Sequence, residues 1–369
     1  MKDVPAVSLF RFFRAPMSAS SRSPVAVIGA GAAGLAAAWA LRDEAEVTVF
    51  EKSRGVSGRA ATRRRTTDAG LWRYDHGAQY VKTPEGAARD LLHDALPTGD
   101  LVDIDRPVWT FDETGHIKPG DEGHNRDGKW TYRTGVSALG KHLAEASGAT
   151  IRTETRVHGL ERTAQGWRVH ADVAAHGPFD AVLVTPPAPQ SADLVQASTL
   201  DADLRALLVD GLRQATYRKI YALVLAYEES LLRPGEAYAF VNTDGAHPVS
   251  WFAFEEDKPG HAPDGSLLMA HMAADWTRDH YTLDLDDLVA AARPILSDLL
   301  DTPLDEPDWA DRQRWRYALP DAAADADALV LGAEHGLFFA GDFMAGKGRV
   351  HLALESGLAA ADHIRSTFS

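Results

Sequence analysis

Residues 25–51 read VAVIGAGAAGLAAAWALRDEAEVTVFE, and this stretch decides the fold. The β-branched apolar run at residues 25–28 is typical of a buried parallel strand, and the glycine-rich turn of residues 29–34 follows it directly. Residues 35–41 are rich in alanine and predict a helix, after which residues 46–50 predict a second strand. Strand, turn, helix and strand in this order predict a βαβ unit.

The turn carries the spacing GxGxxG, the fingerprint of a Rossmann-type dinucleotide site. Gly29 permits the tight turn, Gly31 lets the backbone approach a pyrophosphate, and Gly34 lets helix and strand pack closely. The amino terminus of the helix offers unpaired N–H groups and a favourable dipole to the phosphates. Glu51 ends the second strand, where its carboxylate can accept hydrogen bonds from ribose hydroxyls and disfavours a 2′-phosphate.

Polar segments after the fingerprint predict further contacts to a nucleotide. Arg59 follows the acidic residue in a glycine-rich turn, and we expect its guanidinium near the pyrophosphate. Residues 63–65, three arginines, are expected to form a solvated basic loop. Residues 75–80 form an expected turn, whose glycine and alanine would let the backbone run against a flat ring.

The carboxyl end is the second informative region. A buried strand is expected over residues 337–340, with Gly341 and Asp342 directly after it and a helix from Val350 to Ile364. The Asp342 carboxylate is placed to accept hydrogen bonds from a polyol chain. The helix amino terminus can sit under an electron-accepting ring and stabilise negative charge, which suits a flavin.

The middle of the chain is mixed and then β-rich. A helix is expected from Thr134 to Ala146, and another over residues 283–300 with a break or kink at Pro294. Strands are expected over residues 150–157, 166–173, 179–184, 220–227, 238–242, 249–254 and 266–272.

The composition excludes several classes of function. The formal net charge is −15, which disfavours nucleic acid and anionic membrane surfaces as partners. No apolar run approaches the roughly 18 residues of a membrane span. Cysteine is absent, so disulfides, thiolate nucleophiles, metal–thiolate sites and a cysteine-linked flavin are excluded. We expect a cytoplasmic protein with no resident metal.

Residues 1–23 differ from the rest of the chain. Arg11 and Arg14 lie among phenylalanines, and a serine-rich stretch follows. The segment lacks the apolar core of a secretory signal, about 7 residues at minimum. We expect a flexible extension, or a start site placed ahead of Met17, with an amphipathic targeting helix as the alternative.

Four motifs resemble the FAD-dependent amine oxidase superfamily, and within it the renalase-like flavoproteins. They are EKSRGVSGRAATR at residues 51–63, DHGAQY at 75–80, WRY at 315–317, and GD at 341–342 with ESGLAA at 355–360. The resemblance runs from Val25 to Ile364. It departs from the family pattern at Ser57, where relatives have the first glycine of a doublet, and at residues 343–346, which face the expected substrate side.

The resemblance implies an α/β fold, α+β overall, in which a Rossmann-type FAD-binding domain interleaves with a β-rich substrate domain. The FAD domain would comprise residues 24–80, 140–192 and 328–369, and the substrate domain residues 81–139 and 193–327. Non-covalent FAD would contact the fingerprint, the residues holding its ADP half, and those along its ribityl chain and ring. These are Gly29, Gly31, Ala33, Gly34, Glu51, Lys52, Arg59, Ala78, Gln79, Val157, Gly341, Asp342 and Val350.

The same resemblance implies an oxidase. Isomeric dihydronicotinamide dinucleotides (2- or 6-dihydro NAD(P)H) would give a hydride to FAD, and O2 would reoxidise the flavin to release H2O2. The sequence has no second GxGxxG after a strand, so the substrate would dock transiently. An amine oxidase or desaturase of a small molecule is the alternative, and a flavin-binding redox sensor without turnover is an alternative of another class.

No catalytic side chain is identified from the sequence, because direct hydride transfer requires no general base. The candidates for the substrate face of the flavin are His76, Tyr80, Trp251, Tyr317 and His351. Aromatic residues at strand spacing also fit a hydrophobic core, and a single histidine near a turn also fits a structural role.

Overall fold

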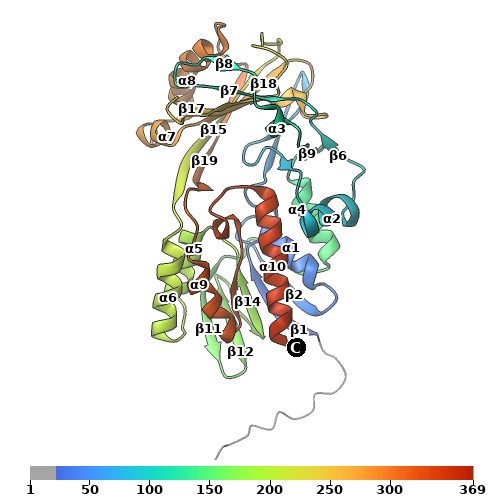
Figure 1. Ribbon diagram of the computed structural model, residues 1–369, viewed down its shortest axis with the longest axis vertical. Coiled ribbons are helices and arrows are strands. Elements are labelled where there is room, and N and C mark those ends of the chain that lie inside the picture. The colour runs from blue at the N-terminus through green and yellow to red at the C-terminus, as the bar shows by residue number, and fades with distance from the viewer. Residues whose placement is uncertain (1–21, 369) are drawn as a thin grey trace, which may run out of the picture.

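The computed structural model describes residues 22–368 and has two main sheets, one in each half of the molecule (Figure 1). The fold is mixed α/β with a Rossmann-like half, as predicted. Of the extension predicted at residues 1–23, residues 1–21 lie outside the part of the chain that the structure describes. Within residues 22–368, no helix is both long and apolar enough to cross a bilayer.

The Rossmann-like half is built on five parallel strands in the order β10–β2–β1–β14–β20. Central β1 places Val25 between Val47 of β2 and Ala181 of β14, and all three residues are buried. Burial on both faces explains the continuous apolar runs in the sequence. The strand bounds are Thr150–Arg152 (β10), Ala45–Phe50 (β2), Ser23–Ile28 (β1), Ala181–Val184 (β14) and Leu337–Phe339 (β20).

Helices and a small sheet cover the two faces of this parallel sheet. On one face pack α1 (Ala32–Leu41), α4 (Ala138–Ser147) and α10 (Val350–Phe368). The other face is covered by α5 (Ala188–Gln196), α6 (Ala202–Arg213), α9 (Ala326–Val330) and the antiparallel strands β11 (Val157–Thr163), β12 (Gly166–Ala171) and β13 (Ala175–Phe179). The strand predicted over residues 150–157 is therefore wrong in extent, because β10 ends at Arg152 and β11 begins at Val157.

The second half is built on a seven-stranded sheet in the order β19–β15–β18–β17–β16–β7–β8. Its bounds are Trp309–Pro320 (β19), Tyr217–Tyr227 (β15), Ser266–Met272 (β18), Val249–Phe254 (β17), Ala239–Asn242 (β16), Val108–Phe111 (β7) and Ile117–Lys118 (β8). β19 is an edge strand, and Figure 1 shows β15 and β19 reaching down toward the Rossmann-like half. Apart from Ser23 at the start of β1, all strands of the five-stranded sheet lie within the residues predicted for the FAD domain, and all strands of the seven-stranded sheet lie within those predicted for the substrate domain. The limits of the two domains stay a prediction.

Helix α8 (Leu285–Leu300) packs on the seven-stranded sheet together with α7 (Ala274–Asp279). Of the two alternatives expected at Pro294, a break or a kink, the break is wrong, because the helix continues through this residue. Pro294 lies on the exposed face, where water can satisfy the carbonyl that loses its helical partner. The opposite face buries Leu288, Ala292 and Leu296, and this packing holds the helix together.

Smaller elements connect the two halves. The predicted basic loop at residues 63–65 is wrong, because β3 (Thr62–Thr67) pairs with β4 (Gly70–Asp75). The alternation of a strand turns Arg63 toward Asp311 (2.8 Å) and Arg65 over the ring of Trp309 (4.8 Å). The remaining elements are β5 (Val81–Lys82), β6 (Leu101–Asp103), β9 (Lys129–Tyr132), α2 (Gly86–Asp90), a π-helix (Leu91–Ala95), α3 (Glu122–Asn125) and the 3₁₀ turns Glu255–Asp257, Leu331–His335 and Asp342–Met344.

Candidate active site

A cavity of about 780 Å³ lies at the carboxyl ends of the parallel strands, beneath the seven-stranded sheet. Its size falls in the range of pockets that hold small ligands and cofactors. Eleven of the predicted cofactor residues line it: Gly29, Gly31, Ala33, Glu51, Lys52, Arg59, Ala78, Val157, Gly341, Asp342 and Val350. Ile220, His271, Trp315 and Tyr317 from the second half complete the lining, so both halves contribute to one site.

The amino terminus of α1 opens into this cavity. Gly31 is the N-cap residue and makes no side-chain capping bond, so N–H groups of the first turn remain free for a ligand. A Cβ at Gly31 would meet no atom within 4 Å, which leaves the backbone accessible from the cavity. Gly34 lies behind it, where a Cβ would come within 2.1 Å of the Gly29 carbonyl oxygen. Only glycine fits this approach of helix to strand.

Glu51 stiffens the fingerprint turn. Its two carboxylate oxygens accept hydrogen bonds from the backbone N–H groups of Ala30 (2.9 Å) and Ser53 (2.8 Å). Each oxygen retains lone-pair capacity for a ligand hydroxyl. The neighbouring Lys52 donates to Gln190 (3.0 Å), and burial together with the charge of Arg156 lowers the pKa of Lys52.

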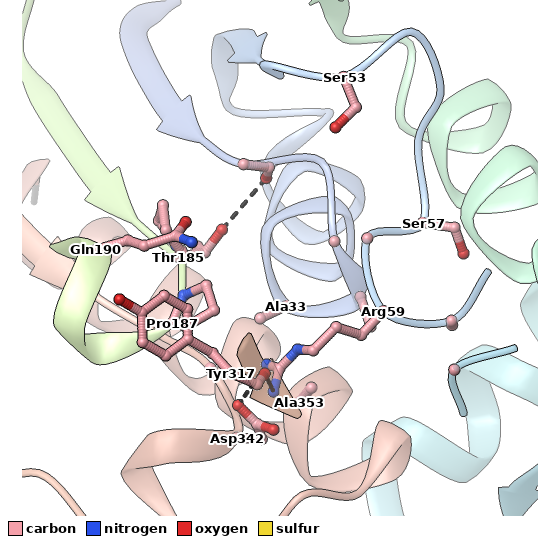
Figure 2. A pocket seen from close by; sticks show the side chains of 18 of the residues that line it. Ala33, Ser53, Ser57, Arg59, Thr185, Pro187, Gln190, Tyr317, Asp342 and Ala353 are labelled. Atoms are coloured by element: carbon pink, nitrogen blue, oxygen red, sulfur yellow. Dashed lines mark hydrogen bonds and ion pairs between the residues drawn. The ribbon is translucent and has the colours of Figure 1, made fainter. Parts of the chain in front are cut away.

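Arg59 and Asp342 meet in the cavity, although they are 283 positions apart (Figure 2). Nη2 of Arg59 lies 2.7 Å from Oδ1 of Asp342, and Nη1 donates to the carbonyl of Ala318 (3.0 Å). Burial opposes the charge of Arg59, but Asp342 outweighs this effect and raises the pKa of Arg59. The sequence assigned the two residues to different parts of FAD; here each neutralises the other.

The turn of residues 75–80 runs along the cavity. A Cβ at Gly77 would lie 1.9 Å from the Arg59 carbonyl oxygen, and the N–H of Ala78 donates to that oxygen (2.9 Å). Gln79, predicted to lie along the flavin, is not among the residues that line the cavity. Its amide oxygen accepts from Nζ of Lys258 (2.9 Å) and from the hydroxyl of Tyr238 (3.2 Å).

Lys258 is the centre of a buried ionic cluster that the sequence did not predict. Its side chain is 0% exposed, and Nζ lies 3.0 Å from Asp75 and 2.7 Å from Glu255. Nδ1 of His261 lies 3.1 Å from the other oxygen of Glu255. Burial raises the pKa of Asp75, but the charges of Lys258 and His261 outweigh it and hold this pKa below its usual range.

The same cluster has the geometry of a possible metal site. Ligand atoms of Asp75, Glu255 and His261 lie within 4.8 Å of one another. The ammonium of Lys258, however, already ion-pairs with both carboxylates and takes the place that a cation would occupy. The cluster therefore acts as an internal ion network that joins the turn of residues 75–80 to the second half.

Some of the residues predicted for the substrate face lie at the cavity, and others do not. Tyr317 lines the cavity, and His76 stacks on the ring of Trp315, which also lines it, at 5.5 Å. Trp251 and Tyr80 do not line the cavity: the ring of Trp251 contacts that of the lining residue His271, and the ring of Tyr80 contacts that of Tyr238. His351 belongs to the first turn of α10, and burial together with the charge of Arg349 lowers its pKa.

His271 on β18 is the cavity residue that sequence reasoning missed. Its Nε2 is buried and has no hydrogen-bond partner among the described residues. Burial, and next the charge of Lys258, lower the pKa of His271 to about 3; burial and the charge of Arg63 lower the pKa of His76 to about 4. Both imidazoles are neutral at pH 7. The signal in the sequence was one imidazole in the otherwise apolar stretch SLLMAHM.

These two histidines predict an acid-sensitive fold. Below about pH 6.5 they take up protons in the unfolded chain, while the folded chain resists protonation until about pH 4 and 3, so stability falls with pH across this window. Between pH 7 and pH 5, protonation of His271 in the unfolded chain should lower the free energy of unfolding of wild type by up to about 2 kcal/mol. We expect His271→Phe to escape this part of the loss. Urea unfolding at both pH values measures this. His116→Phe, on an exposed turn, is the control, and equal losses in all three proteins would contradict the prediction.

The lining suits a dinucleotide electrostatically. Five cationic side chains line the cavity (Lys52, Arg59, Arg156, Arg316 and Arg349) against three carboxylates (Glu51, Asp193 and Asp342). With neutral histidines the lining carries a formal charge of +2, within a chain of net charge −15. A diphosphate carries about two negative charges, and a free helix amino terminus faces the same space. The residues present therefore fit FAD.

Comparison with protein families agrees with this geometry. The model of the flavin containing amine oxidoreductases matches residues 114–365, which is more than half of the chain. The chain belongs to this family. A second family model, the NAD(P)-binding Rossmann-like domain, matches residues 27–95. This amine oxidoreductase is an FAD-dependent enzyme.

Two curated proteins are similar to parts of this chain. Renalase of Mus musculus is 27% identical over 220 residues, which are 56% of this chain and 58% of renalase. The flavin-containing monooxygenase FMO GS-OX-like 6 of Arabidopsis thaliana is 30% identical over 179 residues, 46% of this chain and 35% of that protein. The chain thus spans between about a third and three fifths of the length of these relatives.

A solved structure shows the fold over nearly the whole chain. Cyclohexylamine oxidase of Brevibacterium oxydans superposes with a TM-score of 0.73 at 14% identity, covering 94% of this chain and 100% of that one. At this identity the similarity establishes the fold alone, and the substrate has to be argued from the cavity.

Proposed function

We propose that this amine oxidoreductase is an oxidase that takes a hydride from an isomeric dihydronicotinamide dinucleotide, a 2- or 6-dihydro form of NAD(P)H, and passes the electrons to O2. A C–H bond of the dihydro ring breaks, its hydrogen leaves with two electrons, and O2 with this hydrogen and one proton gives H2O2. The similarity to renalase supports this substrate class.

One observation carries the proposal: among the described residues that line the cavity from the second half, which form its roof, none has a carboxylate. The three carboxylates in the described lining follow β2 (Glu51), lie on α5 (Asp193), or follow β20 (Asp342), all in the Rossmann-like half. The roof consists of apolar and aromatic residues, of His271, which is neutral at pH 7, and of Arg316, which is a cation. An ammonium substrate would find no anionic partner there, whereas a neutral dihydronicotinamide ring would find flat and apolar walls.

The side chains of the roof would orient the ring. Trp315 is held by its indole N–H, which donates to the His76 carbonyl (2.7 Å), and by stacking on the His76 ring. His271, with its free Nε2, can hydrogen-bond a carboxamide without accepting a full proton, since its pKa is about 3. When bound, FAD supplies the hydride acceptor, and no side chain has to remove a proton from the substrate.

Anaerobic stopped-flow absorbance tests the proposal. The FAD-loaded protein is mixed with 2- and 6-dihydro isomers of NADH, with ordinary NADH and with simple amines. We expect rapid bleaching of the flavin band by the isomers, and one H2O2 per substrate oxidised in air. Bleaching by amines alone would overturn the proposal in favour of an amine oxidase, and no bleaching by any compound would overturn it in favour of a flavin-binding protein without this turnover.

A further inference from the structure

The edge of the seven-stranded sheet is irregular beside the cavity. The pairing of β15 with β19 passes from Arg218 opposite Leu319 to Ile220 opposite Trp315, so one residue of β15 faces three of β19. These three, residues 316–318, all line the cavity. In a regular strand, consecutive side chains point to opposite faces of the sheet. A bulge changes their direction, and here both Trp315 and Arg316 line the cavity.

Three cations surround this bulge, and we call Lys219, Arg314 and Arg316 the cationic rim. Arg314 pairs with Tyr221 and shares its face of the sheet, and Lys219, two positions before Tyr221, lies on that face too. Nζ of Lys219 and Cζ of Arg314 lie 5.1 Å and 4.6 Å from the ring centroid of Tyr281. One aromatic ring thus orders two exposed cations at an edge strand.

The rim lacks the carboxylates that neutralise its neighbours. Arg218 pairs with Asp321, and Arg63 pairs with Asp311 at 2.8 Å. Within residues 22–368, Lys219, Arg314 and Arg316 have no carboxylate within 4 Å. Three cations close together repel one another, and this repulsion destabilises the folded chain. The chain has 53 acidic residues, yet none of those described neutralises the rim. This charge is available to an anionic ligand.

We propose that the cationic rim binds the phosphate groups of a nucleotide substrate whose ring enters the cavity. The proposal rests on the proposed function, which supplies a dinucleotide as the substrate. Guanidinium groups bind phosphate through paired N–H donors, and an ammonium adds a point charge. Lys219 and Arg314 share the ring of Tyr281, and Arg316 follows Arg314 by two positions, within the bulge.

The rim is distinct from the place expected for the phosphates of FAD. The free amino terminus of α1, with Gly31, faces the cavity from the Rossmann-like half, and Arg59 reaches it from the same half. Lys219 and Arg314 belong to the outer face of the other half, and only Arg316 reaches the shared cavity. The ring of the substrate would lie under Trp315, and its phosphates would leave past Arg316.

The test compares two triple variants of the FAD-loaded protein. Lys219→Met/Arg314→Gln/Arg316→Gln removes the rim, and Lys118→Met/Lys141→Met/Arg213→Gln removes three exposed cations elsewhere, so both change the net charge equally. ADP and inorganic pyrophosphate are titrated by isothermal calorimetry at low and high salt. We then measure KM for the isomeric dinucleotide and for the matching dihydronicotinamide nucleoside, which has no phosphate.

We expect the rim variant to bind ADP about a hundredfold more weakly than wild type and to raise KM for the dinucleotide by a similar factor, with KM for the phosphate-free nucleoside nearly unchanged. The control variant should match wild type. Unchanged ADP affinity in the rim variant, or loss of its FAD, would overturn the proposal. If no isomer reduces the flavin but ADP still binds through the rim, the proposed function fails while the phosphate site stands.

Discussion

Replacing Lys258 with methionine should lower the free energy of unfolding by about 3–5 kcal/mol, because it leaves buried carboxylates without their cation. Methionine has a similar length and no charge, so the variant tests charge rather than volume. Asp75 and Glu255 are both 0% exposed at the side chain, and each has Nζ of Lys258 within 3.0 Å. Urea denaturation of the FAD-loaded protein, followed by circular dichroism, measures the loss.

Lys118→Met is the matched control, since Lys118 is exposed on β8 and should cost less than about 0.5 kcal/mol. A compensating variant separates charge from packing: Lys258→Met with Glu255→Gln removes one of the two uncompensated charges and should recover part of the loss. If Lys258→Met unfolds within about 1 kcal/mol of wild type, the cluster is not the ionic network described here.

The βαβ unit could be predicted because all of its signals are local. Strand, glycine turn, helix and acidic residue lie within residues 25–51, and each position has one steric or electrostatic reason. Four strands of the second half, β15 to β18, were recognised for the same reason, since β-branched and aromatic runs indicate burial without reference to any partner, whereas β7, β8 and β19 were missed. The break expected at Pro294 was wrong because the rule that proline interrupts a helix takes no account of which face of the helix is exposed.

The contacts that shape the site could not be predicted, because they join distant positions. Lys258 reaches Asp75 across 183 positions, and Arg59 reaches Asp342 across 283. Read singly, Lys258 in the polar stretch EEDKPG is typical of a solvated turn, and Arg63 is typical of a basic loop. A sequence gives the charge of each residue, but tertiary packing determines which charges meet and which, as in the cationic rim, are left unpaired.

Replacing Glu51 with arginine should weaken FAD binding sharply while the chain remains folded. The carboxylate holds the N–H groups of Ala30 and Ser53, and charge-assisted hydrogen bonds of this kind contribute about 1.5–3 kcal/mol each. Losing both should weaken FAD by about a hundredfold or more. The arginine side chain would also place a cation where two backbone donors converge. The ratio of flavin to protein absorbance after gel filtration measures the occupancy.

Glu46→Arg is the control on the same strand, because Glu46 is exposed and lies on β2 away from the fingerprint. It changes the net charge equally and should keep full occupancy. Glu51→Gln should fall between the two, because its amide retains one oxygen that can accept from Ala30 or Ser53 but not from both. Full flavin content in Glu51→Arg would mean that the turn is ordered without the carboxylate, and that the cofactor is held mainly by Arg59, Asp342 and the helix amino terminus.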